Sequence, residues 1–273
     1  MRDESIIITE SYSDLCRPKM YASSILGTRK YQQDSYAYIE TDQGCLAMVC
    51  DGMGGLEGGE RASALAIDTV FRDYLKEMPL KNAAHFLYRE AVKADNRVYN
   101  LTDRNGKLLG AGTTMVGAYI QGNYITWVSV GDSKIYIIRN NAMHTVVREH
   151  NYRQMLNERL QNGTISPEKY RSEVVRGDAL TSFIGIGDLK LIEINRKPFE
   201  LIEGDVIVLC SDGLYKALKE TQILAIIRDN YFDYKRAAKI LTDTALRYSP
   251  KGQDNTTVVL IDYSSGVPGL YDY

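Results

Sequence analysis

The stretch that decides the fold is Ala47-Met-Val-Cys-Asp-Gly-Met-Gly-Gly-Leu-Glu-Gly-Gly-Glu60. The short apolar run 46–50 predicts a buried strand, because it is brief and glycines follow it. The run ends in Asp51, and the glycines after it let the backbone approach other groups closely and expose its carbonyls. A carboxylate at a strand end, beside a carbonyl that is free to turn outward, suits a hard cation that prefers oxygen ligands.

The same arrangement, an aspartate at the end of a predicted strand, recurs four more times. An Asp-Gly pair by itself usually marks a plain turn, so the recurrence carries the argument. Five carboxylates gathered where neighbouring strands end would repel one another by about 1 to 4 kcal/mol per close pair without cations between them. The sequence therefore predicts a metal site. The other four are Asp34 before the run 35–40, Asp132 after 124–130, Asp212 after 205–210, and Asp254 before 256–261.

The bulk composition is that of an ordinary soluble globular protein. Of 273 residues, 44% are hydrophobic and 25% charged, and the net charge of −2 favours neither a nucleic-acid nor a membrane partner. The apolar runs are too short to span a membrane, and the N-terminal run is too short for a signal peptide. The four cysteines show no Cys-x-x-Cys spacing, which disfavours zinc and predicts reduced thiols in a cytoplasmic protein. They are Cys16, Cys45, Cys50 and Cys210.

Helical and strand periodicities alternate along the chain in a definite order. Two amphipathic helices precede a block of antiparallel hairpins, and two more helices follow that block. Each helix pair needs a sheet face to cover, and each antiparallel sheet must bury one face. We therefore predict an α+β fold, a four-layer α/β/β/α sandwich of two antiparallel sheets flanked by helix pairs. The predicted helices are 57–77, 81–102, 220–228 and 234–248, and the strands are 21–26, 35–40, 46–50, 112–120, 124–130, 134–139, 143–147, 189–195, 205–210 and 256–263.

Smaller features complete the predicted organisation of one domain over residues 1–273. Asn82 and Thr221 are expected to cap their helices. Residues 149–176 form a polar, helical insertion between strands, which is either a flap over a site or a plain surface excursion. A short strand is predicted at 6–9, and the tail 264–273 is expected to be loosely held.

The ligand set points to a particular metal chemistry. Oxygen donors without histidine or cysteine favour Mg²⁺ or Mn²⁺. We expect Asp51 to bridge two ions, with the Gly52 carbonyl on one and Asp212 and Asp254 on the other. Two ions about 3.5–4 Å apart serve phosphoryl hydrolysis by aiming a bridging water at phosphorus. Arg29 would then clamp the phosphate oxygens, and the alternative is a solvated surface arginine.

At this point the sequence resembles the metal-dependent type 2C protein serine/threonine phosphatases (PPM class), in particular their bacterial members. The resemblance runs from about residue 21 to residue 262, and its motifs stand in the family's order. The motifs are Arg29-x4-Asp34-Ser35, Asp51-Gly-Met-Gly-Gly55, Gly112-Thr-Thr114, Gly131-Asp-Ser133, Leu180-Thr-x3-Gly185, Cys210-Ser-Asp-Gly-Leu214 and Gln253-Asp-Asn-Thr-Thr257.

The resemblance implies both a function and further site residues. It implies hydrolysis of phosphoserine and phosphothreonine in proteins, the products of a serine/threonine kinase, by direct attack of a metal-bridging water. By position, Asp34 is similar to the aspartate that holds metal-bound waters, and Arg29 to the phosphate-binding arginine. Asp132 is similar to the residue that, with Asp212, holds a weaker third ion. The insertion 149–176 is similar to the family's variable flap.

Three positions depart from the family's pattern, and two other functions stay open. Met53 stands where many eukaryotic members carry a histidine thought to protonate the leaving group, and bacterial members often share the methionine. Gln33 replaces a glutamate of eukaryotic members, and Ser182 replaces an arginine of many bacterial members. The alternatives are a catalytically inactive relative that binds phosphoproteins, and a hydrolase of small phosphate esters. No predicted direct ligand is missing, which disfavours the inactive relative.

Overall fold

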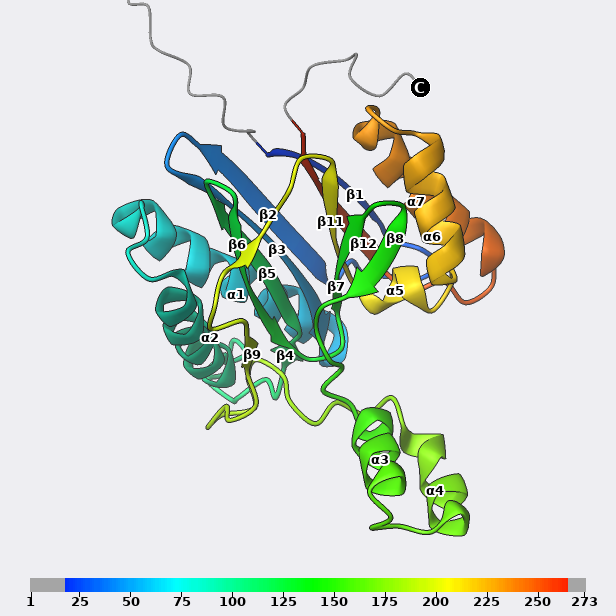
Figure 1. The fold of residues 1–273 in the computed structure, drawn as a ribbon. Coiled ribbons are helices and arrows are strands. Elements are labelled where there is room, and N and C mark those ends of the chain that lie inside the picture. The colour runs from blue at the N-terminus through cyan, green and yellow to red at the C-terminus, as the bar shows by residue number, and fades with distance from the viewer. Residues whose placement is uncertain (1–17, 265–273) are drawn as a thin grey trace, which may run out of the picture.

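The structure is a computed structural model that describes residues 18–264, apart from the side chains of Leu56 and Glu57. The strand predicted at 6–9 and almost all of the tail predicted at 264–273 lie outside the described residues. Within the described part, two antiparallel sheets lie face to face between two groups of helices (Figure 1). The predicted α+β sandwich is thereby confirmed.

The first sheet has five strands in the order β1-β12-β11-β7-β8, and the second has seven. In the second, the order is β10-β6-β5-β3-β2, with β4 paired to β3 and β9 paired to β6. The strands are β1 (Lys19–Ile25), β2 (Asp34–Thr41), β3 (Gly44–Met53), β4 (Gly112–Thr113), β5 (Met115–Gln121), β6 (Tyr124–Val130), β7 (Lys134–Arg139), β8 (Ala142–Thr145), β9 (Glu193–Ile194), β10 (Phe199–Glu200), β11 (Asp205–Cys210) and β12 (Thr256–Tyr263).

The helices form the two outer layers. Helices α1 (Gly55–Glu77) and α2 (Ala83–Tyr99) cover the seven-stranded sheet, and α6 (Glu220–Asp229) and α7 (Tyr234–Tyr248) cover the five-stranded sheet (Figure 1). The short helix α5 (Asp212–Tyr215) follows β11 directly. Three apolar clusters fill the three interfaces between these four layers.

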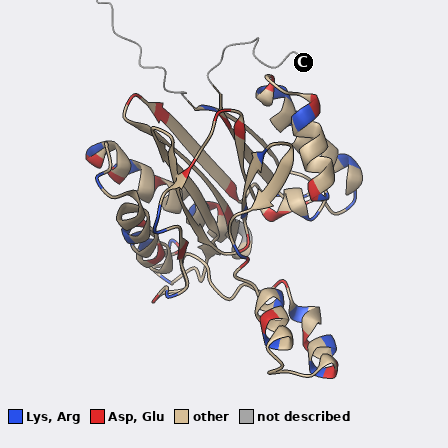
Figure 2. Cartoon of the chain, viewed as in Figure 1, with Lys and Arg blue, Asp and Glu red and all other residues tan. Residues whose placement is uncertain are grey.

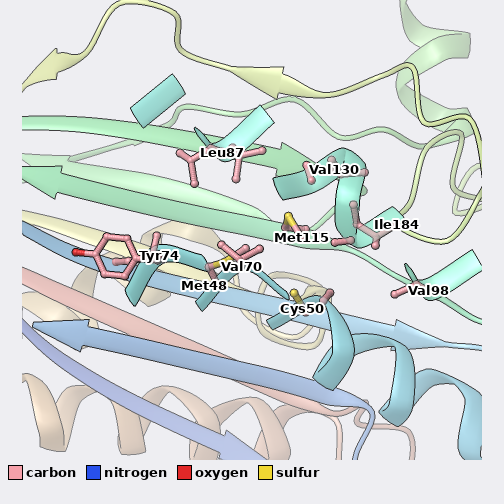
Figure 3. Packing of buried hydrophobic residues seen from close by; sticks show 14 of the residues in the cluster. Met48, Cys50, Val70, Tyr74, Leu87, Val98, Met115, Val130 and Ile184 are labelled. Atoms are coloured by element: carbon pink, nitrogen blue, oxygen red, sulfur yellow. The ribbon is translucent and has the colours of Figure 1, made fainter. Parts of the chain in front are cut away.

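Strand β3 shows why its sequence is continuously apolar. Leu46, Met48 and Cys50 face the layer of α1 and α2, whereas Ala47 and Val49 face the other sheet. Both faces of the strand are therefore buried, so alternation with polar residues is absent. Figure 3 shows Met48 and Cys50 packed among Val70, Leu87 and Met115 in the outer of these two clusters.

Two details of the prediction were wrong. Helix α6 is capped by Lys219 and not by Thr221, and the Lys219 N–H donates to Oε1 of Gln222 at 2.9 Å. The strand predicted at 189–195 shrinks to β9 at both ends. Before β9, the Leu189 N–H donates to Oδ2 of Asp95 at 3.3 Å and the Leu191 carbonyl accepts from the Ser182 hydroxyl at 2.8 Å. After β9, the Asn195 side chain replaces the backbone as partner of β6. Its Oδ1 accepts from the Trp127 N–H at 2.6 Å, and its Nδ2 donates to the Ile125 carbonyl at 3.0 Å. Pairing resumes at β10, which the sequence did not reveal.

The insertion contains α3 (Tyr152–Gln161), α4 (Pro167–Glu173) and the 3₁₀ turn η1 (Val174–Arg176). These helices project from one end of the sandwich (Figure 1). At its base, the Thr181 N–H donates to the His150 carbonyl at 2.8 Å, and the His150 N–H donates to the Gly131 carbonyl at 2.8 Å. The insertion therefore begins and ends beside the loop that carries Asp132.

Charged residues lie mainly on the helices and loops, whereas the strands are largely uncharged (Figure 2). Within residues 18–264, no helix is both long and apolar enough to cross a membrane. Cys45, Cys50 and Cys210 are free and buried, and burial raises the pKa of Cys45 to about 12. Cys16 lies outside the described residues.

Candidate metal centre

The pairing of β2 with β3 places two of the predicted aspartates side by side. Asp34 and Asp51 are direct partners in this antiparallel register, and the Gly52 N–H donates to the Gln33 carbonyl at 3.0 Å. The backbone of Asp51 is held on its other side as well. Its N–H donates to Oγ1 of Thr114 at 2.9 Å, and its carbonyl accepts from the Thr114 N–H at 2.8 Å.

Ser211 joins the two sheets at the same end of the sandwich. Its hydroxyl donates to Oδ2 of Asp34 at 2.7 Å and accepts from the Thr257 N–H at 2.9 Å. Because Ser211 directly precedes Asp212, this contact brings the end of β11 to the end of β2. Asp212 is therefore fixed near the Asp34–Asp51 pair by a hydrogen bond between residues 177 positions apart.

Asp254 reaches the same place through close backbone approach. Gly27 has a φ of +64°, and a Cβ there would lie 2.3 Å from the Asp254 carbonyl oxygen. The next residue, Asn255, donates from Nδ2 to the carbonyls of Leu26 and Tyr31 at 2.9 and 3.0 Å. The loop that carries Arg29 is thus fastened to the start of β12.

Electrostatics show that the five carboxylates act on one another. The pKa of Asp51 is raised well above its ordinary value by burial first, and then by the charges of Asp34, Asp212, Asp132 and Asp254. Burial also raises the pKa of Asp34 to about 7, although hydrogen bonds from Ser211 and Thr257 oppose the rise. These shifts mean that a negative charge is costly here unless a cation balances it.

Asp132 experiences the same environment. Burial, followed by the charge of Asp212, raises its pKa to about 6. The Tyr215 hydroxyl donates to the Asp132 backbone carbonyl at 3.0 Å, and the nearby charge of Lys216 favours the ionised carboxylate. Asp132 therefore belongs to the same group of carboxylates as the other four.

The residues present fit a hard divalent cation. Oδ1 of Asp34 and Oδ1 of Asp212 are buried, and among the described residues neither has a hydrogen-bond partner. A buried carboxylate oxygen without a donor is costly, and a cation would relieve that cost. The donors offered are oxygens, which Mg²⁺ and Mn²⁺ prefer.

The carboxylates surround the centre without converging on one point. Across residues 18–264, no three acidic, thiol or imidazole side chains converge on a single point. Two of the carboxylates instead form ion pairs with basic side chains of the same chain. Arg29 Nη2 lies 2.5 Å from Oδ2 of Asp254, and the Lys216 ammonium contacts Oδ2 of Asp212. An ion that used either of these oxygens would have to displace the cation already there.

Arg29 lies at the edge of this group of carboxylates and not on a remote surface. Its side chain is 56% exposed and bonded to Asp254, so it borders the carboxylates and also faces solvent. Such a position is compatible with capture of an incoming phosphate. Its role as the phosphate clamp stays a prediction, as do the ligand roles of the aspartates.

Gly52 is confined more tightly than a turn requires. A Cβ at this position would lie 2.1 Å from the Gly59 carbonyl oxygen, so no other residue fits without a backbone shift.

Among the departures from the family's pattern, Gln33 donates from Nε2 to the Gly55 carbonyl at 3.1 Å. The Ser182 hydroxyl is buried and donates to the Leu191 carbonyl at 2.8 Å, so it is committed to its own loop.

Several residues of the site were missed when the sequence was considered alone. They are the groups that hold the aspartates: hydroxyl or amide side chains next to a strand end, and one cation. For Ser211 and Asn255 the available signal was their position directly beside Asp212 and Asp254, but it did not reveal which partner each would bond. The missed residues are Thr114, Ser211, Lys216 and Asn255.

Comparison with known proteins agrees with this geometry. The family model described as Protein phosphatase 2C matches residues 24–252. The serine/threonine phosphatase stp of Listeria welshimeri is 26% identical over 238 residues, which cover 86% of this chain and 91% of that protein. The serine/threonine protein phosphatase PstP of Mycobacterium tuberculosis is 29% identical over 229 residues, which cover 84% of this chain and 41% of PstP.

Solved structures show the same fold. The catalytic domain of PstP in complex with two manganese ions has a TM-score of 0.73 and 25% identity, covering 91% of this chain and 99% of that one. The Mycobacterium tuberculosis PstP/Ppp structure has a TM-score of 0.75 and 26% identity, with the same coverage. The fold and the site together define a class of phosphatases that have a four-layer α/β/β/α sandwich and a cluster of aspartates at one end of it. This chain belongs to the protein phosphatase 2C family.

Proposed function

We propose that this protein is a Mn²⁺- or Mg²⁺-dependent phosphatase that hydrolyses phosphoserine and phosphothreonine in proteins. The observation that carries the proposal is the gathering of five carboxylates at one end of the sandwich, where two buried oxygens have no partner among residues 18–264. Family membership supports it, as do the serine/threonine phosphatases among the relatives and the two manganese ions in the PstP structure.

Each residue of the centre has a proposed task. Asp51, the Gly52 carbonyl, Asp212 and Asp254 would hold two core ions, and Asp132 with Asp212 would hold a weaker third. When bound, the ions supply Lewis acidity and lower the pKa of coordinated water. Asp34 would orient water through its free Oδ1, while Ser211 keeps its other oxygen in place.

Arg29 would capture the substrate phosphate. Its guanidinium offers paired donors that match phosphate geometry, and its partly exposed position lets a phosphorylated side chain reach it. Binding would require the guanidinium to leave Asp254. An ion held by Asp254 would favour that move, because the carboxylate charge would then already be balanced.

The partner class follows from the same reasoning. We propose phosphorylated proteins, the products of a serine/threonine kinase, as substrates in the cytoplasm, where free buried cysteines such as Cys50 persist. Small phosphate esters remain the second candidate substrate class, because nothing in the described centre excludes them. The insertion that contains α3 and α4 is proposed as the flap that distinguishes protein substrates from small ones.

The test is hydrolysis of a phosphothreonine peptide and of an aryl phosphate by the full chain, with Mn²⁺ and with EDTA. We expect hydrolysis of both with Mn²⁺ and none with EDTA. Asp51→Asn should be inactive, whereas Asp229→Asn, which removes an exposed carboxylate at the end of α6, should retain activity. Full activity in EDTA would contradict the proposal, and activity on the aryl phosphate alone would favour small esters.

A further inference from the structure

Lys216 contacts one of the two carboxylates of the proposed third-ion site. It follows α5, and its ammonium group contacts Oδ2 of Asp212 four residues earlier. The Asp212 side chain is 14% exposed and the Lys216 side chain is 47% exposed, so the contact lies at the border between the centre and solvent. The other oxygen of Asp212 is buried and has no partner among the described residues.

The same ammonium group serves Asp132. The residue directly before Lys216 contacts Asp132, because the Tyr215 hydroxyl donates to the Asp132 backbone carbonyl at 3.0 Å. Asp132 is buried, and the charge of Lys216 favours its ionised carboxylate. A single positive charge therefore balances both carboxylates that the third ion would use.

We propose that Lys216 is a built-in counter-ion of the Asp132–Asp212 pair, and that a third divalent cation binds there only by displacing its ammonium group from Asp212. The proposal rests on the proposed function, because it assumes that this pair belongs to a working metal centre. It goes beyond that function by identifying the residue that sets the affinity of the third site for its metal ion.

The physical reason is competition for one oxygen. A carboxylate oxygen that already accepts from an ammonium group offers less negative charge to a second cation, and the two cations repel each other. Because the unpartnered oxygen of Asp212 is not held by Lys216, ions that use that oxygen avoid the direct competition. Lys216 should therefore weaken the third site far more than the core sites.

Lys216 also connects the centre to the insertion. Asp178 stands two residues after the insertion and pairs with Arg153 of α3 at 3.1 Å, and its charge attracts the Lys216 ammonium group. Helix α5 lies at the end of the sandwich from which α3 and α4 leave (Figure 1). An ammonium group displaced from Asp212 is therefore still attracted toward the insertion.

The experiment is Mn²⁺ binding to the full chain without substrate, by calorimetry and by electron paramagnetic resonance of free Mn²⁺. Wild type should bind two ions tightly and a third weakly. Lys216→Met, which keeps the stem and removes the charge, should tighten the weak site at least tenfold and the tight sites by much less. Lys216→Arg, which keeps the charge, should leave the weak site as in wild type.

Thermal melting supplies a second readout, because Lys216→Met should change stability in opposite directions without and with metal. Loss of the counter-ion should lower the melting temperature of metal-free Lys216→Met, whereas saturating Mn²⁺ should stabilise this variant more than wild type. An unchanged weak site in Lys216→Met, or an equal shift at all sites, would overturn the proposal. Phosphothreonine hydrolysis by wild type is measured in parallel, so that absence of activity with normal binding would refute the function and not the role of Lys216.

Discussion

Replacement of Asp34 by asparagine should stabilise the metal-free protein at pH 8. Burial raises the pKa of Asp34 from 3.8 to about 7, with further contributions from Asp212 and Asp254. The folded state therefore binds more protons than the unfolded chain between these two values. Stability must then fall as the pH rises from about 4 to about 7, and the penalty is fully present above that range.

The magnitude follows from the shift. Each pKa unit corresponds to about 1.4 kcal/mol, so the ionised Asp34 carboxylate costs on the order of 4 kcal/mol. An asparagine still accepts the Ser211 hydrogen bond, but burying its amide without a partner cancels about half of the gain. The remaining gain of about 2 kcal/mol corresponds to a rise in Tm of roughly 4–8 °C for a domain of this size.

The assay is differential scanning calorimetry of wild type and Asp34→Asn in EDTA at pH 8 and at pH 5. The gain should be present at pH 8 and small at pH 5, where Asp34 is protonated in the folded state. Asp229→Asn controls for the loss of any one carboxylate. A mutant that melts below wild type at pH 8, or that gains equally at both pH values, would refute the reasoning.

Four other changes test individual contacts. Asp51→Asn should lose most of the Mn²⁺-induced stabilisation, which in wild type is about 2.7 kcal/mol at a hundredfold excess over Kd and is measured by thermal melting. Arg29→Ala should lower kcat/KM for a phosphopeptide at least tenfold while calorimetry shows unchanged Mn²⁺ affinity. Asp132→Ala should reduce kcat yet leave two bound Mn²⁺ ions by calorimetry. Asp95→Ala should cost roughly 2–4 kcal/mol in urea unfolding, because the buried carboxylate accepts from three backbone N–H groups, including that of Gly185 at 2.7 Å.

Local sequence pattern determined the elements and the layers. The apolar run of β3 is buried on both faces, and the three- and four-residue spacing of α1 requires a sheet to cover, so a four-layer sandwich follows from periodicity. The boundaries of β12 and α7 were also predictable, because the strand run is continuous and the helix pattern regular. The prediction of a strand at 189–195 was wrong because side chains replaced the backbone ladder, Asp95 and Ser182 before β9 and Asn195 after it.

Tertiary structure decided which aspartates lie together and which groups each of them contacts. The sequence placed Asp34, Asp51 and Asp212 at strand ends, but a strand end has no partner until register and sheet packing are fixed. The direct pairing of Asp34 with Asp51 depends on the β2–β3 register, and the Ser211 bond to Asp34 spans 177 residues. Whether a carboxylate meets a hydroxyl, a cation such as Lys216 or no donor at all depends on side chains brought together only by packing. Periodicity carries no information about such contacts, so the charge balance of the centre could be obtained from the folded chain alone.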